Sequence, residues 1–344
     1  MSERSASGVT RREALRITAV GGLSLAMGGG LVHGLLRRAG LHRVTETRPR
    51  LGTLVTITSV QPEPQAARAL VDAGFAEIER LEAVLNRHAP GTAITRLNER
   101  GRLDGAPGEL LEVLERARLW HERTGGAFDP TVAPVLELWS RRTERGLPPP
   151  TDAEIAEALG RVGFAQVEVE GRRVRFVRPG VALTLDGIAK GYVVDRTVGR
   201  LVAEGAERVM VDAGGDIASG GPATPDDPWT IAVQDPHVPV GSLGRVRLSG
   251  DAVATSGDYM QAFTQDRRHH HILDPRTGRS PDRVSSSTVV AATAMDADAL
   301  STAMLVLGPE EAVALLDALP DAEGLIVAKD GSRWASRGMR LAHA

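Results

Sequence analysis

The sequence has 344 residues, a formal net charge of −3 and 42% hydrophobic residues, which is enough for one large domain or two ordinary ones. The near-neutral charge lacks the basic excess that nucleic-acid binding requires, so we expect no nucleic-acid partner. The absence of cysteine excludes disulfides, thiolate metal sites and a cysteine nucleophile.

The first 44 residues have the composition of a targeting segment. The pair Arg11–Arg12 precedes an apolar, Gly- and Ala-rich stretch from Ile17 to about Leu36. A basic region before an apolar one is typical of an export signal, and the twin arginine favours the Tat pathway, which carries folded proteins. We therefore predict export to the periplasm or to the outer face of the cytoplasmic membrane. The stretch is also long enough for a short anchor, which would associate the protein with the membrane.

Up to residue 177 the patterns mix strands with amphipathic helices. The predicted elements are, in chain order, a strand over Arg48–Val60, helices over 62–88, 108–126 and 151–163, and a hairpin over 165–177. The second helix ends at Gly125–Gly126. Thr151 and Glu154 form the capping-box pattern at the start of the third.

The remaining chain continues the same mixture. It is predicted to form a Gly-punctuated helix over 187–205, a buried strand running into a glycine loop over 208–221, strands over 229–236, 244–250 and 251–263, helices over 295–308 and 309–319, and a closing hairpin over 322–336. Strands and helices do not alternate strictly, which favours α+β over a doubly wound parallel sheet. We find no internal repeat and no long linker, and predict one α+β domain of mixed sheets with flanking helices over 45–344.

Two glycine-rich stretches are candidates for phosphate binding. Gly187 and Gly191 flank Lys190 at a predicted helix start, where backbone N–H groups and an ammonium suit an anion. The more common role of such glycines is to cap a helix, and that of such a lysine is to carry a solvated surface charge. The stretch Val211–Gly221 lets a bulky ligand approach the backbone, or forms a tight hairpin. It is not a G-x-G-x-x-G motif and no helix follows it, which argues against a Rossmann site.

Hydroxyl and carboxylate groups further along indicate an anion site and a metal site. The run from Thr255 to Gly257 suits an anion or a ring edge, although polar turns have the same composition. Asp298 and Thr302 are four residues apart on a predicted apolar helix, so both face one side. Their hard oxygen atoms suit Mg²⁺ rather than Zn²⁺. The alternative is that Asp298 only interacts with the positive end of its helix.

Three consecutive histidines, His269 to His271, precede the sequence ILDPRTG. On a strand, His269 and His271 would share one face and His270 would point to the other. A pair two residues apart can bind Zn²⁺, but no third ligand stands at a familiar spacing. We therefore favour one histidine acting as a general base near neutral pH.

Taken in this order, these stretches resemble the ApbE family of FAD:protein FMN transferases over about residues 48 to 335. The matching segments are LGT at 51–53, TAITRLNERG at 92–101, TGGAFDPTVAPVLELW at 124–139, DGIAKGYVVD at 186–195, DAGGD at 212–216, ATSGDY at 254–259, HHILDPRTGRSP at 270–281 and ADALSTAMLVLG at 297–308. The exported start, together with TLDGIAKGYVVDR, resembles the NosX-like branch of the family.

The resemblance implies a reaction. FAD would lie in a cleft between two lobes of the domain, with its pyrophosphate clamped by Mg²⁺. A threonine hydroxyl of an exported or membrane flavoprotein would attack the FMN-side phosphorus, AMP would leave, and FMN would stay attached through a phosphoester. Because no nucleophile of the enzyme takes part, the enzyme has to supply positioning, charge neutralisation and a base.

The resemblance also implies roles for individual residues. Asp298 and Thr302 would bind the metal through their side chains and Ala189 through its carbonyl, and His271 would be the base. The implied FAD contacts are Thr53, Asn98, Asp129, Asp186, Lys190, Gly214, Gly215, Asp216, Thr255, Ser256 and Gly257.

Two positions depart from the family pattern. Leu51 replaces a methionine and keeps an apolar contact. Asp186 replaces a glycine, and its carboxylate would repel a pyrophosphate unless it reaches the metal or accepts a hydrogen bond from the flavin or ribose.

Two other activities are compatible with the same motifs. One is a non-catalytic FAD-binding protein, and the other is a pyrophosphatase that releases FMN and AMP. The presence of His271, Asp298 and Thr302 argues against a protein that only binds FAD. Transferase and pyrophosphatase use the same metal and cleave the same bond, so the residues do not separate them.

Overall fold

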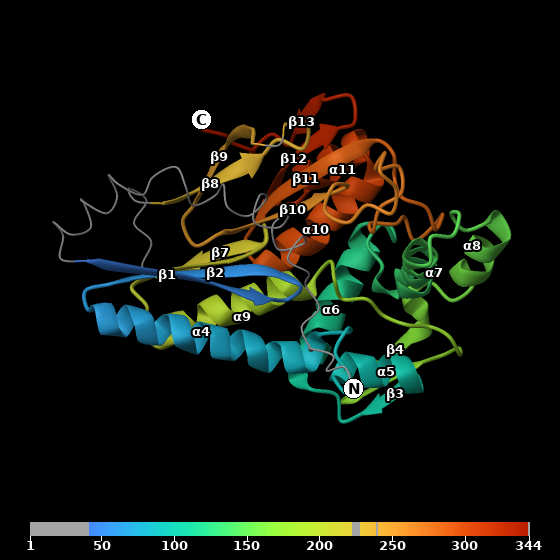
Figure 1. Cartoon of the computed structure of the whole chain (residues 1–344), viewed down its shortest axis with the longest axis horizontal. Coiled ribbons are helices and arrows are strands. Elements are labelled where there is room, and N and C mark those ends of the chain that lie inside the picture. Colours follow the sequence, from blue (N-terminus) through green and yellow to red (C-terminus); the bar gives the residue numbers. More distant parts are fainter. Residues whose placement is uncertain (1–40, 222–227, 239, 343–344) are drawn as a thin grey trace, which may run out of the picture.

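The computed structural model describes residues 41–221, 228–238 and 240–342, which form one large antiparallel sheet with helices packed against it (Figure 1). In spatial order its strands are β1 (His42–Arg50), β2 (Thr53–Gln61), β6 (Arg208–Ala213), β7 (Ile217–Gly220), β10 (Ala252–Gly257), β11 (Val284–Ala291), β12 (Ala322–Ala328) and β13 (Arg333–Ala335). Two smaller sheets contain β3 (Arg102–Asp104), β5 (Arg173–Phe176) and β4 (Val167–Glu170), and β8 (Trp229–Gln234) with β9 (Ser242–Leu248). The prediction of an α+β fold of sheets with flanking helices is confirmed, and the strand pairs within the described sheets are antiparallel.

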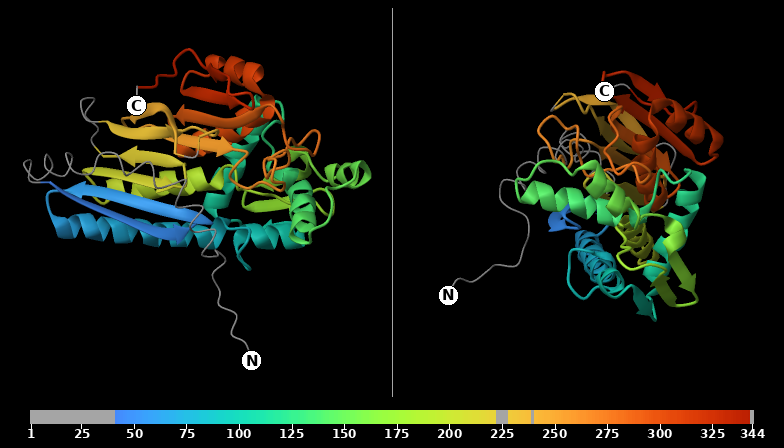
Figure 2. Two further views of the ribbon diagram at one scale, coloured as in Figure 1. Left: turned by 45° about the horizontal axis from the view of Figure 1, so that its top comes forward. Right: turned by 90° about the vertical axis from the view of Figure 1, so that its right-hand side faces the viewer.

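Helices cover one face of the large sheet, and other helices lie at its end (Figures 1 and 2). The covering helices are α4 (Pro64–Leu85), α9 (Ala189–Ala203), α10 (Ala294–Leu307) and α11 (Pro309–Ala318). The others are α5 (Ala93–Arg100), α6 (Gly108–Arg123), α7 (Ala133–Glu144) and α8 (Asp152–Leu159), with the short 3-10 turns η1 (Pro130–Val132) and η2 (Phe164–Gln166). None of the helices in the described ranges is long and apolar enough to cross a membrane.

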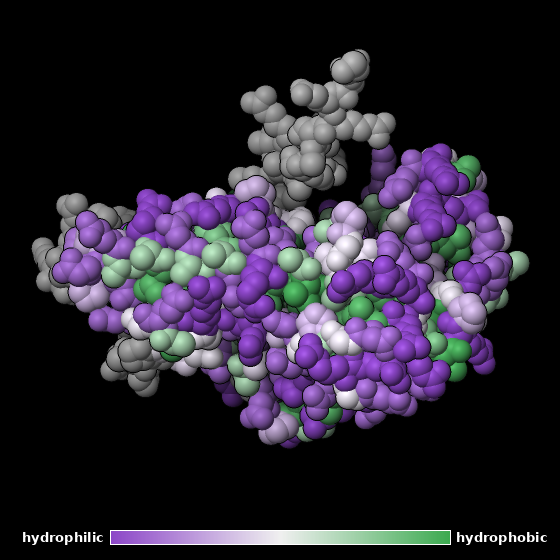
Figure 3. Space-filling model, turned by 90° about the horizontal axis from the view of Figure 1, so that it is seen from below, coloured by the Kyte–Doolittle hydropathy of each residue, from purple (hydrophilic) through white to green (hydrophobic). Residues whose placement is uncertain are grey.

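Alternation along the strands builds a core on each face of the sheet. In β6, Val209 and Val211 join the main core beneath the helices, whereas Met210 joins a second cluster under the β8–β9 ribbon. Helix α4 buries one side, including Leu70 and Phe75, and its other residues face solvent. On the face of the molecule shown in Figure 3, hydrophilic residues predominate and apolar residues are scattered among them.

The predicted strand over Arg48–Val60 is wrong in one respect, because the structure divides it into the β1–β2 hairpin. Leu51 and Gly52 form its two-residue turn with φ of 55° and 70°, the left-handed conformation that hairpin turns of this length favour. Strand β1 begins at His42. The sheet therefore includes residues that we assigned to the targeting segment, most of which lies outside the described residues.

Several further elements differ from expectation. Helices α5 and α7 and strand β11 were not predicted from the sequence. Helix α5 does have readable boundaries, with Thr92 as N-cap and Gly101 in a left-handed C-cap. The glycine loop after β6 is a tight turn into β7. The capping box of Thr151 and Glu154 at the start of α8 is confirmed.

Helices α9 and α10 meet almost backbone to backbone. A Cβ atom on Gly191 would lie 2.2 Å from the carbonyl oxygen of Ala294, which leaves no room for a side chain. The Asp195 carboxylate accepts hydrogen bonds from the N–H groups of Ala294 and Met295, both at 2.8 Å. Thr293 caps the same helix end by accepting from the N–H of Asp296. This junction sets the position of α10 relative to α9.

We predict that Gly191→Ala lowers the free energy of unfolding by about 2 kcal/mol, because the new methyl group forces the two helices apart. Urea denaturation followed by circular dichroism measures the change. Gly199→Ala is the matched control, since a Cβ there meets nothing within 4 Å. That variant should be unchanged or more stable by up to about 1 kcal/mol. Equal stability of the two variants would contradict the described junction.

Candidate functional site

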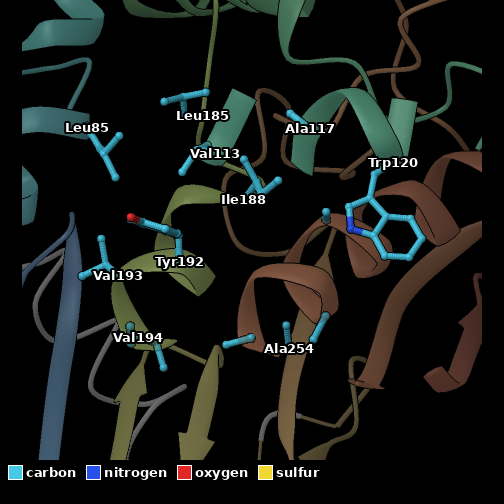
Figure 4. Packing of buried hydrophobic residues seen from close by; sticks show 14 of the residues in the cluster. Leu85, Val113, Ala117, Trp120, Leu185, Ile188, Tyr192, Val193, Val194 and Ala254 are labelled. Atoms are coloured by element: carbon cyan, nitrogen blue, oxygen red, sulfur yellow. The ribbon is translucent and has the colours of Figure 1, made fainter. Parts of the chain in front are cut away.

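The candidate site lies where the start of α9, the middle of α10 and the end of β10 meet. The N–H of Gly191 donates to Oδ2 of Asp298 at 3.2 Å. A Cβ on Gly187 would lie 2.9 Å from Oγ1 of Thr302, and Oγ of Ser256 lies 3.3 Å from the same Oγ1. The structure thus brings the predicted metal-binding residues on α10 next to the α9 start that contains Ala189. Figure 4 shows apolar residues around this junction, among them Ile188 and Tyr192.

Asp298 is a buried carboxylate with too little positive charge nearby to balance its own negative charge. Its residue is only 3% exposed. Burial and the nearby Asp216 raise its pKa to about 8, against the opposing effect of Lys190. A carboxylate in this condition is costly to ionise unless a cation balances it.

A divalent cation fits this set of oxygen atoms. The described residues contain no group of three or more His, Cys, Asp or Glu side chains that could hold a metal. The set implied by the resemblance is instead the Asp298 carboxylate, the Thr302 hydroxyl and the carbonyl of Ala189. Hard oxygen ligands in this small number suit Mg²⁺, which usually keeps several waters.

Lys190 and the β6–β7 turn form the second part of the site. Lys190 donates to Asp216, which is 2% exposed. Burial opposes the charge of Lys190, but Asp216 and Asp298 outweigh burial, so the pKa of Lys190 is raised. A Cβ on Gly214 would lie 2.3 Å from Oγ1 of Thr53, so the first residue of β2 packs against the turn.

The conformation of this turn depends on glycine. Gly214 and Gly215 have φ of 72° and 107°, and the N–H of Gly215 donates to Asp212 at 3.0 Å. The predicted set Thr53, Gly214, Gly215, Asp216 and Lys190 is therefore brought together in the structure.

The predicted run from Thr255 to Gly257 lies on β10 and not in a turn. Ser256 faces α10, where its Oγ lies 2.8 Å from Oγ of Ser301. Alternation places Thr255 on the opposite face of the sheet, where its hydroxyl pairs with that of Thr288 at 2.9 Å. A Cβ on Gly257 would lie 2.4 Å from the Tyr259 ring. Of the three, Ser256 is the one whose side chain belongs to the junction.

Asn98 and Asp129 bond to the protein itself. The amide of Asn98 exchanges two hydrogen bonds with the backbone of Leu183, both at 2.9 Å. Asp129 accepts from the N–H and hydroxyl of Thr131 and from the N–H of Phe164. The carbonyl of Pro130 accepts from Thr184 at 2.8 Å, which joins this loop to the segment before α9. Both residues therefore support the loop that leads into the site.

The histidine run is a loop, so the prediction that His269 and His271 share a strand face is wrong. Only His270 makes an isolated bridge, to Ala262. His270 is fully buried, with Nε2 3.1 Å from the Pro281 carbonyl oxygen. The His269 ring packs 4.6 Å from that of Trp139, centroid to centroid. These two histidines hold the loop in place.

His271 is the histidine next to the site charges. Its Nδ1 lies 3.2 Å from the carbonyl oxygen of Gln261. When Nδ1 donates this bond, Nε2 carries the lone pair that a base needs. Burial and the neighbouring His270 lower the pKa of His271 to about 4, while Asp186 favours its protonated form. At neutral pH the ring is therefore uncharged and can accept a proton.

Sequence reasoning missed two supports of the site. Arg87 binds Oδ2 of Asp186 through Nε at 2.8 Å and through Nη2 at 2.6 Å. Asp296, in the first turn of α10, binds the Arg116 guanidinium and accepts from Trp120 Nε1 at 2.7 Å. The pattern Thr293-x-x-Asp296 is a readable helix-start signal, whereas nothing local indicates the arginine partners.

Comparisons with known proteins identify the family of this chain. The model of the ApbE family matches residues 51–326. The chain is 32% identical to the FAD:protein FMN transferase of Treponema pallidum (strain Nichols) over 88% of this chain and 89% of that protein. The crystal structure of the ApbE protein of Thermotoga maritima superposes with a TM-score of 0.78 at 32% identity, covering 86% of this chain and 97% of that one. Flavin transferase ApbE of Vibrio cholerae gives a TM-score of 0.73 at 28% identity, covering 86% and 98%.

We predict that Asp298→Asn stabilises the metal-free protein at alkaline pH. The folded state holds the pKa of Asp298 at about 8, above the ordinary value of 3.8, so ionisation costs stability as pH rises from about 4 to about 8. Asparagine avoids this cost. In urea denaturation with a chelator, the stability advantage of the variant should grow by at least about 1 kcal/mol between pH 5 and pH 8. If the free energy of unfolding depends on pH in the same way for the two proteins, Asp298 is not a buried carboxylate without a balancing charge.

Proposed function

Because the chain belongs to the ApbE family, we propose that it transfers FMN from FAD to an acceptor protein and releases AMP. The observation that carries this proposal is the buried, poorly matched Asp298 beside the Thr302 hydroxyl and the start of α9. A site of this kind is suited to a cation and a phosphate, and Lys190 adds a positive charge beside it.

Asp298, Thr302 and the carbonyl of Ala189 are the residues that would hold Mg²⁺. Mg²⁺ bound at these residues would neutralise negative charge on the pyrophosphate of FAD. A Cβ atom on Gly215 would meet nothing within 4 Å, so the turn leaves room there for the ligand to approach the backbone. Lys190 remains next to Asp216, within electrostatic range of Asp298.

We assign His271 as the base. Its Nε2 would take the proton from the acceptor threonine hydroxyl while that oxygen attacks the FMN-side phosphorus. The bond from this phosphorus to the bridging oxygen breaks, and AMP carries that oxygen away. Proton removal by a positioned side chain contributes typically about 10² to 10⁴ in rate.

The predicted export signal supports the further proposal that the reaction takes place outside the cytoplasm, on an exported or membrane redox protein. Association with the membrane would then depend on the apolar stretch from Ile17 to about Leu36. The threonine acceptor, Mg²⁺ and the NosX-like assignment likewise belong to the proposal.

We predict that incubation with FAD, Mg²⁺ and an acceptor carrying an exposed threonine produces a fluorescent acceptor band and a mass gain of one FMN. Chelation of the metal should abolish both signals, because the pyrophosphate charge is then unbalanced. Release of free FMN and AMP would instead identify a pyrophosphatase. Tight binding of intact FAD without any cleavage would identify a protein that only binds the flavin.

We predict that His271→Ala reduces transfer by at least about 100-fold, because the base is lost. FAD affinity, measured by flavin fluorescence, should stay within about twofold, since the proton is removed from the acceptor. His269→Ala is the matched control, because that neighbouring ring packs on Trp139. It should retain transfer when the protein is folded. Transfer by His271→Ala at the wild-type rate would show that His271 is not the base.

A further inference from the structure

The acidic residue at position 186 stands beside the proposed phosphate site. It belongs to the loop that leads into α9, one residue before Gly187, which packs against Thr302. Its charge acts on Lys190, on Asp298 and on His271. The Asp186 side chain is 46% exposed, so it faces the solvent side of the site. A bare carboxylate here would repel the phosphates of FAD.

Asp186 is paired with a residue from a distant part of the chain. Arg87, 99 positions earlier, places Nε at 2.8 Å and Nη2 at 2.6 Å from the same oxygen, Oδ2. The N–H of Asp186 donates to the Thr184 hydroxyl at 3.3 Å, and a side-chain hydrogen bond from Thr184 also favours the charged carboxylate. Partial burial of the carboxylate raises the pKa of Asp186, but the charge and hydrogen bonds of Arg87 outweigh it, and the net shift of the pKa is downward. The carboxylate is therefore ionised and its charge is balanced.

The backbone around Arg87 is held on both sides. Arg87 follows Asn86, the C-cap of α4, whose side chain accepts from the N–H of His88 at 2.9 Å. Thr92 donates to the Asn86 carbonyl at 3.0 Å, and Thr95 donates to the Ala89 carbonyl at 2.8 Å. The Arg87 side chain is only 25% exposed. The guanidinium is thus preorganised, unlike that of a typical surface arginine.

The balance of charges explains why such a partner is needed. Three carboxylates, Asp186, Asp216 and Asp298, act on one ammonium, Lys190. Lys190 is committed to Asp216, and Asp298 is the proposed metal ligand. Asp186 would then remain as an unbalanced negative charge at the point where an anionic substrate has to bind.

We propose that Arg87 is a positioning residue for FAD: it neutralises Asp186 and fixes its carboxylate beside the proposed phosphate site. This inference rests on the proposed function, because the ligand is FAD. It assigns Arg87 a role through Asp186 and not through direct contact with phosphate. The loss of Arg87 should therefore be harmful only while the charge of Asp186 is present.

A double-mutant cycle tests this dependence. FAD affinity in the presence of Mg²⁺ is measured by flavin fluorescence for the wild type, Arg87→Ala, Asp186→Asn and the double variant. We predict that Arg87→Ala weakens binding at least about tenfold, the scale of a strong charge coupling. Asp186→Asn should bind within about threefold of the wild type, because asparagine keeps an acceptor oxygen without the charge. The double variant should bind within about threefold of Asp186→Asn.

The controls separate the role of Arg87 from general effects. Arg96→Ala, on the exposed side of α5, removes a neighbouring arginine and should change affinity less than about twofold. Thermal melting without ligand shows which variants are folded. Where Arg87→Ala does not fold, Arg87→Gln in the same cycle replaces it, since it removes the charge and keeps much of the side chain.

Two results would overturn the inference. One is an Arg87→Ala affinity within twofold of the wild type. The other is an equal loss from Arg87→Ala with and without Asp186→Asn, which would show that Arg87 contacts FAD by itself. Failure of the wild type to bind FAD would instead contradict the proposed function, and the inference with it.

Discussion

The backbone contact between α9 and α10 is the constraint on which the rest of the site depends. Gly191 allows the start of α9 to approach the Ala294 carbonyl, and the same glycine donates its N–H to Asp298. One residue thus sets the distance between the helices and holds the carboxylate of the site. Because α10 is buried along most of its length, Asp298 is taken out of water wherever α10 packs correctly. The raised pKa of Asp298 is a direct consequence of this packing.

Other buried polar residues maintain this arrangement. Asp195 and Asp296 hold the N-terminus of α10, one by accepting from its free N–H groups and one by binding Arg116 and Trp120. Asn98 and Asp129 hold the loop before α9. Asn98, Asp129 and Asp195 all lie in segments that resemble family motifs. Their role is to keep the site in place, because a site displaced by about 1 Å loses much of its activity. A motif match therefore does not by itself distinguish a residue that binds the ligand from one that supports the loop.

Asp186 shows how a site can accept a charge that its chemistry disfavours. In the sequence the residue is a departure from the family pattern and predicts repulsion of the pyrophosphate. In the structure the Arg87 guanidinium lies against it, supplied by the end of α4. The repulsion inferred from one residue is thus changed by a second residue that no local pattern connects to it. The net charge of a site therefore depends on all the residues that the fold brings together there.

The sequence by itself determined most of the elements and the candidate residues, although α5, α7 and β11 were not predicted from it. Periodicity of apolar residues, the capping box at Thr151 and the glycines at helix ends depend on near neighbours in the chain, so they can be read without the fold. Asp298 and Thr302 could be paired because they are one helical turn apart. Only the tertiary structure decided that His271 lies near the charges of Asp186 and Lys190. It also decided that Thr255 points to the face of the sheet opposite Ser256, and that Arg87 binds Asp186. Those contacts join segments far apart in sequence, and their distances are set by how helices and strands pack, which no local pattern encodes.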